Sequence, residues 1–223
     1  MKKLKSICAI LTLLVSMASC SNDSNVTNQP GDVDLKPIPA ACSKVQQIPF
    51  AQQSNAFANR LFTVLAEQPA NQGKNVCVAP ISMQYMLSMI ANGAEESLQR
   101  EIVAALGFEN IGQLNADNRN LNDKLAQDAA YVQVGLSNGM WLDQQRSYLP
   151  AFQGTMQNYY MADMQTAGFY DTKNHSSINA AIDAWAKEHT NGQIKTLPID
   201  LNILTRLVSV SANYFDAKWA SPF

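Results

Sequence analysis

The sequence contains few of the residues from which catalytic and metal centres are built. Among its 223 residues there are two histidines and four cysteines. It has no H-E-x-x-H or C-x-x-C motif, and no glycine-rich loop with the spacing that cradles a phosphate. No group of histidine, cysteine and aspartate has the spacing of a metal site. We therefore expect a protein that is not an enzyme and that uses no metal and no cofactor.

Basic charge is also scarce once the first residues are set aside. Residues 1–19 hold three lysines and no acidic side chain. Without them, 13 basic side chains remain against 18 acidic ones, a net charge of −5. No basic stripe is left that could follow a phosphate backbone, and this argues against nucleic acid as a partner.

The N-terminus has the pattern of an export signal. Three lysines are followed by an apolar run over residues 7–15, which is too short for a stable transmembrane helix. Ala18 and Ser19 then precede Cys20, which resembles a bacterial lipobox. This pattern predicts a lipoprotein signal peptide over 1–19 and a lipid on Cys20, with an ordinary cleaved signal as the alternative. Ser21 favours the outer membrane or cell surface, so we expect an exported protein held at a membrane by its lipid.

Residues 20–48 are polar, contain prolines and show no hydrophobic period, which is typical of a flexible tether. Two cysteines remain beyond the presumed lipid site. Cys42 and Cys77 could pair in an oxidising compartment, and the sequence does not decide this. Because Cys77 lies in the apolar run "VCVAP", we expect a buried free thiol.

The folded domain is predicted to cover 49–223 and to begin with a series of helices. Apolar spacing predicts a helix over 52–68, a short strand over 76–79 and a second helix from Pro80, with Ser82 as its candidate N-cap. Met83, Met86, Leu87 and Ile90 are expected to form the apolar face of that helix. Helices are also expected from Glu95 to Gly107 and over 112–127.

The second part of the domain mixes helices with strands. Helices are predicted over 147–160 and 176–192, and a strand over 162–169. The run "TRLVSVSANYF" alternates and predicts a strand with Val208, Val210, Ala212 and Tyr214 on one face. The stretch before these strands is mainly helical and lacks the alternating β-α-β units of a parallel α/β sheet.

One motif invites an enzymatic interpretation. Residues 135–139 spell G-x-S-x-G, the nucleophile elbow of serine hydrolases, with Ser137 as the candidate nucleophile. An elbow needs a helix after the second glycine, whereas apolar and aromatic residues continue past Gly139. The alternatives are a hairpin that turns at Asn138-Gly139, and one long strand with small residues where something packs closely.

Four blocks occur in an order and at intervals that resemble the N-terminal half of a serpin. They are "NVCVAPISMQYMLSMIANGA", "GLSNGMWLD", "INAAIDAWAKEHTNGQIKTLP" and "LVSVSANYFDAKWASPF". The resemblance implies an α+β serpin-like fold with helices A–F packed around part of a large central β-sheet A. It also implies that "GLSNGMWLD" is a single strand of that sheet. The C-terminal half of the fold is then expected to be missing from this chain.

The resemblance also implies roles for individual residues. Ser82 and Asn213 match polar positions of the shutter, which lies beneath the central sheet, and Ala79 stands where the family commonly has another shutter serine. Trp219 matches the tryptophan of the breach, where the sheet first opens. Helix residues Ile178, Ile182 and Trp185 match the helix that crosses the sheet and must yield when the sheet expands.

The function that the resemblance implies is suicide-substrate inhibition of serine or cysteine proteases by loop insertion into the sheet. The reactive loop is expected beyond Phe223, so this chain alone is not expected to inhibit. A non-inhibitory surface lipoprotein with a binding or structural role is the alternative. No glycosaminoglycan site is evident, because Arg119 and Lys124 lie among Asp117, Asp123 and Asp128.

Overall fold

A computed structural model of the chain describes residues 51–126 and 132–217. Helices and strands alternate irregularly along these residues. The α-helices are α1 (Ala51–Ala66), α2 (Pro80–Gly93), α3 (Glu96–Leu106), α4 (Ile111–Leu125), α5 (Pro150–Tyr160) and α6 (His175–His189). Two short 3-10 helices are η2 (Pro69–Asn71) and η3 (Thr172–Asn174). The strands are β1 (Val132–Asp143), β2 (Asp163–Ala167) and β3 (Leu207–Ala217).

The three strands form one mixed sheet in the order β2-β1-β3. β1 pairs in parallel with β2, with Gly139 opposite Asp163, and antiparallel with β3, with Gly139 opposite Val210. Because side chains alternate along a strand, one face of β1 carries Gly139 and Trp141 and the other carries Asn138 and Met140.

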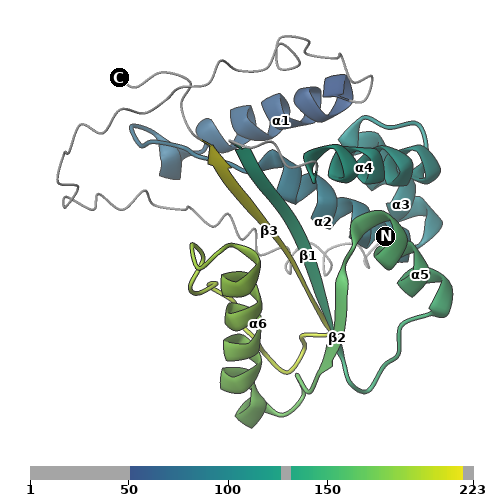
Figure 1. Ribbon diagram of the computed structural model, residues 1–223, viewed down its shortest axis with the longest axis vertical. Helices are drawn as coiled ribbons and strands as arrows, with labels where there is room; N and C mark the ends of the chain where they lie inside the picture. The colour runs from purple at the N-terminus through teal and green to yellow at the C-terminus, as the bar shows by residue number, and fades with distance from the viewer. Residues whose placement is uncertain (1–50, 127–131, 218–223) are drawn as a thin grey trace, which may run out of the picture.

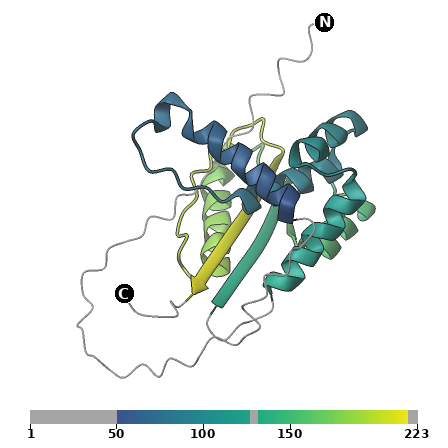
Figure 2. The ribbon, with the colours of Figure 1, turned by 90° about the horizontal axis from the view of Figure 1, so that it is seen from above.

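Helices cover both faces of this sheet (Figures 1 and 2). On the first face, α6 packs with Trp141, Val210 and Ala212. On the second face, α2 and α5 pack against Met140 through Tyr85, Met89, Met156 and Tyr160. A third apolar cluster joins α1, α2, α3 and α4, away from the strands, around Phe57, Met83, Val103, Leu106 and Leu114. The sheet is therefore the middle layer between one helix and a group of helices.

The predicted helices and the two later strands are confirmed within a few residues. Gly107 ends α3 in the left-handed conformation, with φ of 87°, as its position after the apolar pattern indicated. Met140 and Trp141 continue the strand begun at Val132, so residues 135–139 form neither a hairpin nor an elbow. Ser137 lies in mid-strand opposite Ala212, which confirms the interpretation as one long strand.

The packing of two tryptophan rings explains why β1 has a glycine at position 139. A Cβ atom placed there would lie 2.7 Å from Cη2 of Trp141 and 3.1 Å from the Trp185 ring. The two tryptophan rings themselves meet edge to face, with centroids 5.5 Å apart. Gly139 thus leaves the space that this aromatic pair occupies against the sheet.

Three expectations near α2 are wrong. Ser82 is not the N-cap: the helix begins at Pro80, and Ala79 occupies the cap position without a side-chain hydrogen bond. Proline suits the first helical position because the N–H it lacks would have had no partner there. Residues 76–79 form no strand, and Cys77 is exposed rather than buried. The segment pairs with no strand in the described residues, so no packed layer covers the thiol.

No helix within 51–126 or 132–217 is long and apolar enough to cross a bilayer. In the same residues, no three histidine, cysteine or acidic side chains gather as metal ligands would.

Candidate functional site

The outer edge of β3 is the first part of the candidate site. β3 pairs with β1 on one side, and no strand in the described residues pairs with its other side. From Leu207 to Phe215 the strand carries neither charge nor proline, the features that usually protect an edge. An extended segment could therefore add to β3 through main-chain hydrogen bonds.

Buried polar atoms without partners lie on the α2-facing side of the two long strands. Both polar atoms of the Asn213 side chain, the Ser209 hydroxyl and Oδ1 of Asn138 are buried and make no hydrogen bond to any residue within 51–126 or 132–217. Such atoms cost roughly 1–3 kcal/mol each when left unpaired. Partners for these atoms would have to come from outside the described residues.

Ser82, which the resemblance assigns to the shutter together with Asn213, is half-buried in the first turn of α2. α2 packs against β3, but the described residues show no hydrogen bond between the Ser82 and Asn213 side chains. The shutter role of this pair stays a prediction. Trp219, predicted for the breach, lies outside the described residues, as do Cys20 and Cys42.

A network of buried amide and hydroxyl groups joins α2 to α4 and α5. Asn118 accepts a hydrogen bond from Nε2 of Gln84 (2.8 Å) and donates one to Oγ of Ser88 (3.0 Å). Asn92 and Asn115 exchange side-chain hydrogen bonds of 2.8 and 2.9 Å. α4 is polar in composition, and the inward orientation of its asparagines was not predicted from the sequence. Asparagines at positions 115, 118 and 122, spaced as one helical face, were the available signal.

Tyr160 connects this network to the sheet. Its hydroxyl donates to Oδ1 of Asn115, and its backbone carbonyl accepts from Nδ2 of Asn138, 2.9 Å away on β1. Burial raises the pKa of the Tyr160 hydroxyl to about 12, although hydrogen bonds from neighbouring side chains oppose the shift. Burial raises the pKa of Tyr85 in the same way, and its hydroxyl donates to the Asn118 carbonyl at 2.6 Å. Both phenols are therefore neutral structural donors at ordinary pH.

The opposite face of the sheet is covered by α6. Ile178, Ile182 and Trp185, the residues predicted for the sheet-crossing helix, are all buried in the cluster that contains Trp141 and Val210. Nε1 of Trp185 donates to Oδ2 of Asp163, 2.7 Å away at the start of β2. The structure thus places this helix over the sheet, while its predicted movement stays a prediction.

The chain after Thr190, the C-cap of α6, runs back along the helix as an extended segment, which we call the strap (residues 191–201). Three α6-side groups hold it by hydrogen bonds to its backbone. Thr190 Oγ1 accepts from the Ile194 amide (3.0 Å), Asp183 Oδ1 accepts from the Leu197 amide (2.7 Å), and Asn179 Nδ2 donates to the Ile199 carbonyl (3.3 Å). Because these bonds join helix to strap and not to the strands, α6 and the strap are built as one unit.

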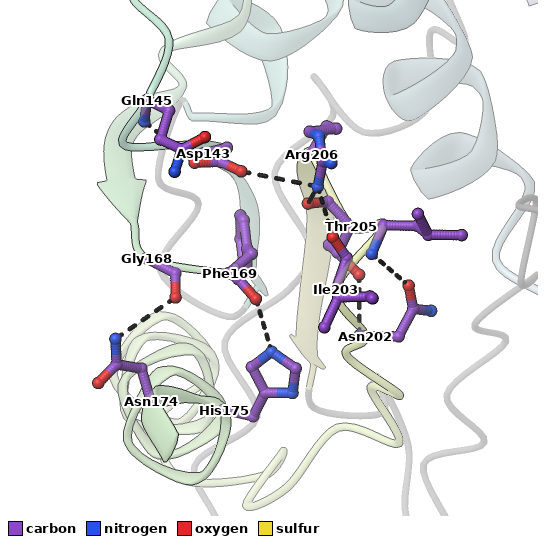
Figure 3. Close-up of polar contacts among 11 residues, drawn as sticks. Asp143, Gln145, Gly168, Phe169, Asn174, His175, Asn202, Ile203, Thr205 and Arg206 are labelled. Carbon is purple, nitrogen blue, oxygen red and sulfur yellow. Dashed lines mark hydrogen bonds and ion pairs between the residues drawn. The ribbon is translucent and has the colours of Figure 1, made fainter. Parts of the chain in front are cut away.

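Polar contacts fasten this unit where α6 begins (Figure 3). His175 Nε2 lies 2.7 Å from the Phe169 carbonyl, and Asn174 Nδ2 donates to the Gly168 carbonyl at 3.4 Å. At the end of β1, the buried Asp143 carboxylate faces Arg206 at 3.7 Å. The helix start and the residue before β3 are thereby tied to the ends of β1 and β2.

Comparison with known proteins gives a consistent result. The family model described as "Serpin (serine protease inhibitor)" matches residues 52–223. The chain is 30% identical over 169 residues to a leukocyte elastase inhibitor of Bos taurus, covering 75% of this chain. It is 30% identical over 172 residues to Serpin-Z2A of Triticum aestivum, again covering 75% of this chain.

A solved serpin structure, AtSerpin1 of Arabidopsis in its native stressed conformation, matches with a TM-score of 0.63 at 26% identity. That match covers 77% of this chain and 43% of AtSerpin1. The chain spans 44% of the length of the bovine protein and 43% of the wheat protein.

Proposed function

Because this chain belongs to the serpin family, we propose that the whole protein inhibits serine or cysteine proteases by accepting its own cleaved loop as a new strand of the sheet. The relatives that carry inhibitor names support the protease as the partner class. The observation that carries the mechanism is the outer edge of β3, which is unpaired in the described residues and carries neither charge nor proline from Leu207 to Phe215.

In such an inhibitor the covalent step takes place on an exposed loop, and the residues described here act afterwards by receiving the loop as a strand. A protease nucleophile attacks a peptide bond of an exposed loop and forms an acyl-enzyme, and the amine fragment leaves. The loop then pairs with β3, and the new strand pairing drives the change. The residues described here receive the strand: β3 offers its edge, Asn213 offers unpaired polar atoms, and the α6–strap unit covers one face.

The inhibitory proposal is tested by incubating the whole protein with a panel of serine and cysteine proteases and running denaturing gels. We expect a stable band of higher mass that requires the protease's active-site nucleophile. An inactive nucleophile variant of each protease is the control. Cleavage of the protein by every protease without such a band would instead favour the non-inhibitory alternative.

A second measurement tests strand addition itself. After cleavage of the reactive loop, the protein should unfold at a higher temperature and higher denaturant concentration than before, because the sheet has gained a paired strand. Cleavage within the strap is the matched control, since it adds no strand. An equal or lower stability after loop cleavage would contradict insertion beside β3.

We propose in addition that the protein is a lipoprotein held at the outer membrane or cell surface through Cys20. The support is the order of basic residues, apolar run and Ala18-Ser19-Cys20 before a polar tether. Metabolic labelling with a fatty-acid analogue should mark the wild type and not Cys20→Ala. Equal labelling of the two would show that the lipid is not on this residue.

A further inference from the structure

The C-terminal end of α6 is joined to the start of β2 by three side chains, which we call the α6 clasp (Asp163, Trp185 and His189). Trp185 donates from Nε1 to Oδ2 of Asp163 at 2.7 Å, and His189 Nε2 lies 3.4 Å from the same oxygen. The His189 ring stacks on the Trp185 ring, with centroids 4.5 Å apart and planes 28° apart. The three side chains thus form one packed unit between the C-terminal end of α6 and the start of β2.

Both nitrogens of His189 face oxygen acceptors. Nδ1 lies 2.9 Å from the Trp185 carbonyl oxygen, and Nε2 lies near the Asp163 carboxylate. A neutral imidazole carries only one N–H, so in either tautomer one nitrogen lone pair would face an oxygen. When protonated, the ring donates from Nδ1 to the Trp185 carbonyl and places its positive charge 3.4 Å from the Asp163 carboxylate.

The other groups around His189 do not supply a competing ion pair in the described residues. Of the α6-facing positions of β1, Asp143 is the ionisable one, and its carboxylate faces Arg206 at the far end of the strand from Gly135. On β3 that face carries Tyr214 and the acidic Asp216, which accepts from the Tyr214 hydroxyl and, in the described residues, forms no ion pair with His189. The other charged residues of α6 and the strap are Asp183, Lys187, Glu188, Lys195 and Asp200, and none of these described residues forms an ion pair with His189. Asp163 is therefore the acidic group that its charge meets.

We propose that the α6 clasp is a proton-dependent latch: it holds α6 on the sheet more firmly when His189 is protonated and releases it more readily when His189 is neutral. Histidine is the side chain suited to such a change near neutral pH. A slower opening of the sheet in acid than at neutral pH would follow, and that consequence alone rests on the proposed function. The latch itself concerns the resting packing and requires no protease.

The charge state is tested on the full chain by NMR, with ¹³C in the histidine rings. The chain has two histidines, so His189→Gln assigns the two signals. Asp163→Asn is the matched variant, because its amide oxygen still accepts from Trp185 while the negative charge is gone. We expect the response of the His189 ring signals to pH to differ between wild type and Asp163→Asn, because the negative charge beside Nε2 is gone, and the His175 signals serve as the internal control. Superimposable His189 titrations in wild type and Asp163→Asn would overturn the proposal.

The holding strength is tested by hydrogen exchange of the α6 amides, corrected for the intrinsic pH dependence of exchange. Between about pH 5.5 and about pH 7.5 we expect local opening of α6 to increase about two- to fivefold in the wild type, the size expected of a half-exposed ion pair. His189→Gln should show no such increase, and β1 amides serve as the internal control for folding. An increase of equal size in His189→Gln would overturn the latch. Failure of either experiment leaves the protease assay unaffected, so the two proposals fail separately.

Discussion

The two faces of the sheet are covered in different ways. On one face, α2, α4 and α5 interlock through apolar side chains and a buried network around Asn118 and Tyr160. On the other, α6 and its strap are bonded mainly to each other and meet the strands through aromatic packing and contacts at the two ends of the helix. We call the first group of helices (α2, α4 and α5) the floor and the second unit (α6 and the strap) the cover, and the two differ in that the cover makes its polar contacts with the strands only near the ends of its helix.

The largest expected effect separates the two faces directly. Met89 and Ile182 are both fully buried, on the floor and the cover respectively. Replacing either by alanine should remove about 2–5 kcal/mol of local packing energy. For Met89→Ala we expect the loss in the global free energy of unfolding, measured by denaturant titration. For Ile182→Ala we expect it mainly in faster hydrogen exchange of α6 and the strap. An equal loss of protection in β1 and α2 for Ile182→Ala would break the distinction.

The second effect concerns alkaline pH and belongs to the floor alone. Tyrosine ionises near pH 10 in an unfolded chain, whereas burial raises the pKa of Tyr160 to about 12. Its contribution is therefore fully present below about pH 10 and is lost as the pH rises toward 12, by about 2–3 kcal/mol. Tyr160→Phe should flatten this part of the stability profile. Parallel profiles from about pH 9 to about pH 12 would contradict the assignment.

The third test introduces a methyl group at the cover. Gly139→Ala would place Cβ within 3.1 Å of both tryptophan rings, so we expect a loss of about 1–3 kcal/mol through overpacking. The near-ultraviolet circular dichroism of the tryptophan pair should change with it. Gly154→Ala is the control, because its Cβ meets nothing within 4 Å on α5, and it should stabilise by about 0.5–1 kcal/mol. Unchanged stability and spectrum for Gly139→Ala would mean that the aromatic pair moves aside freely.

The smallest effect tests whether helix and strap move together. Asp183→Ala removes the acceptor of the Leu197 amide and should cost about 1 kcal/mol. The strap should become more susceptible to limited proteolysis than α6 itself, with Lys187→Ala, an exposed residue of the same helix, as the control. Cleavage of helix and strap at equal rates in the variant would show that this bond does not hold the strap separately.

Local sequence patterns predicted the elements whose determinants lie close together in the chain. Gly107 ended α3, and the alternation from Val208 to Ala212 gave β3. The pattern failed where the deciding partner is distant. Cys77 was judged by its apolar neighbours, although burial of an extended segment depends on a second strand to pair with it. Ser82 was judged by its residue type, although Pro80 had already fixed the start of the helix.

For the candidate site, the family resemblance predicted roles for Ser82, Asn213 and the α6 residues. The amide network and the clasp were not predicted. Gln84 and Ser88 look like surface residues of a helix until α4 is placed beside them. In the same way, Asp163 and His189 are 26 positions apart and belong to different elements. Contacts of this kind depend on tertiary packing, which a periodic pattern along one segment does not encode.

The strand order has a consequence during biosynthesis. β1 is the middle strand, but 64 positions separate its last residue from the first residue of β3. At about 5–20 residues per second, a ribosome needs roughly 3–13 s to produce that interval. During this time β2 can join β1 on one side only, and the other side of β1 offers unpaired main-chain groups from Val132 to Leu142, a stretch without charge or proline. The nascent chain therefore passes through a vulnerable interval in which a chaperone, or a neighbouring nascent chain, can reach β1 before β3 has been made.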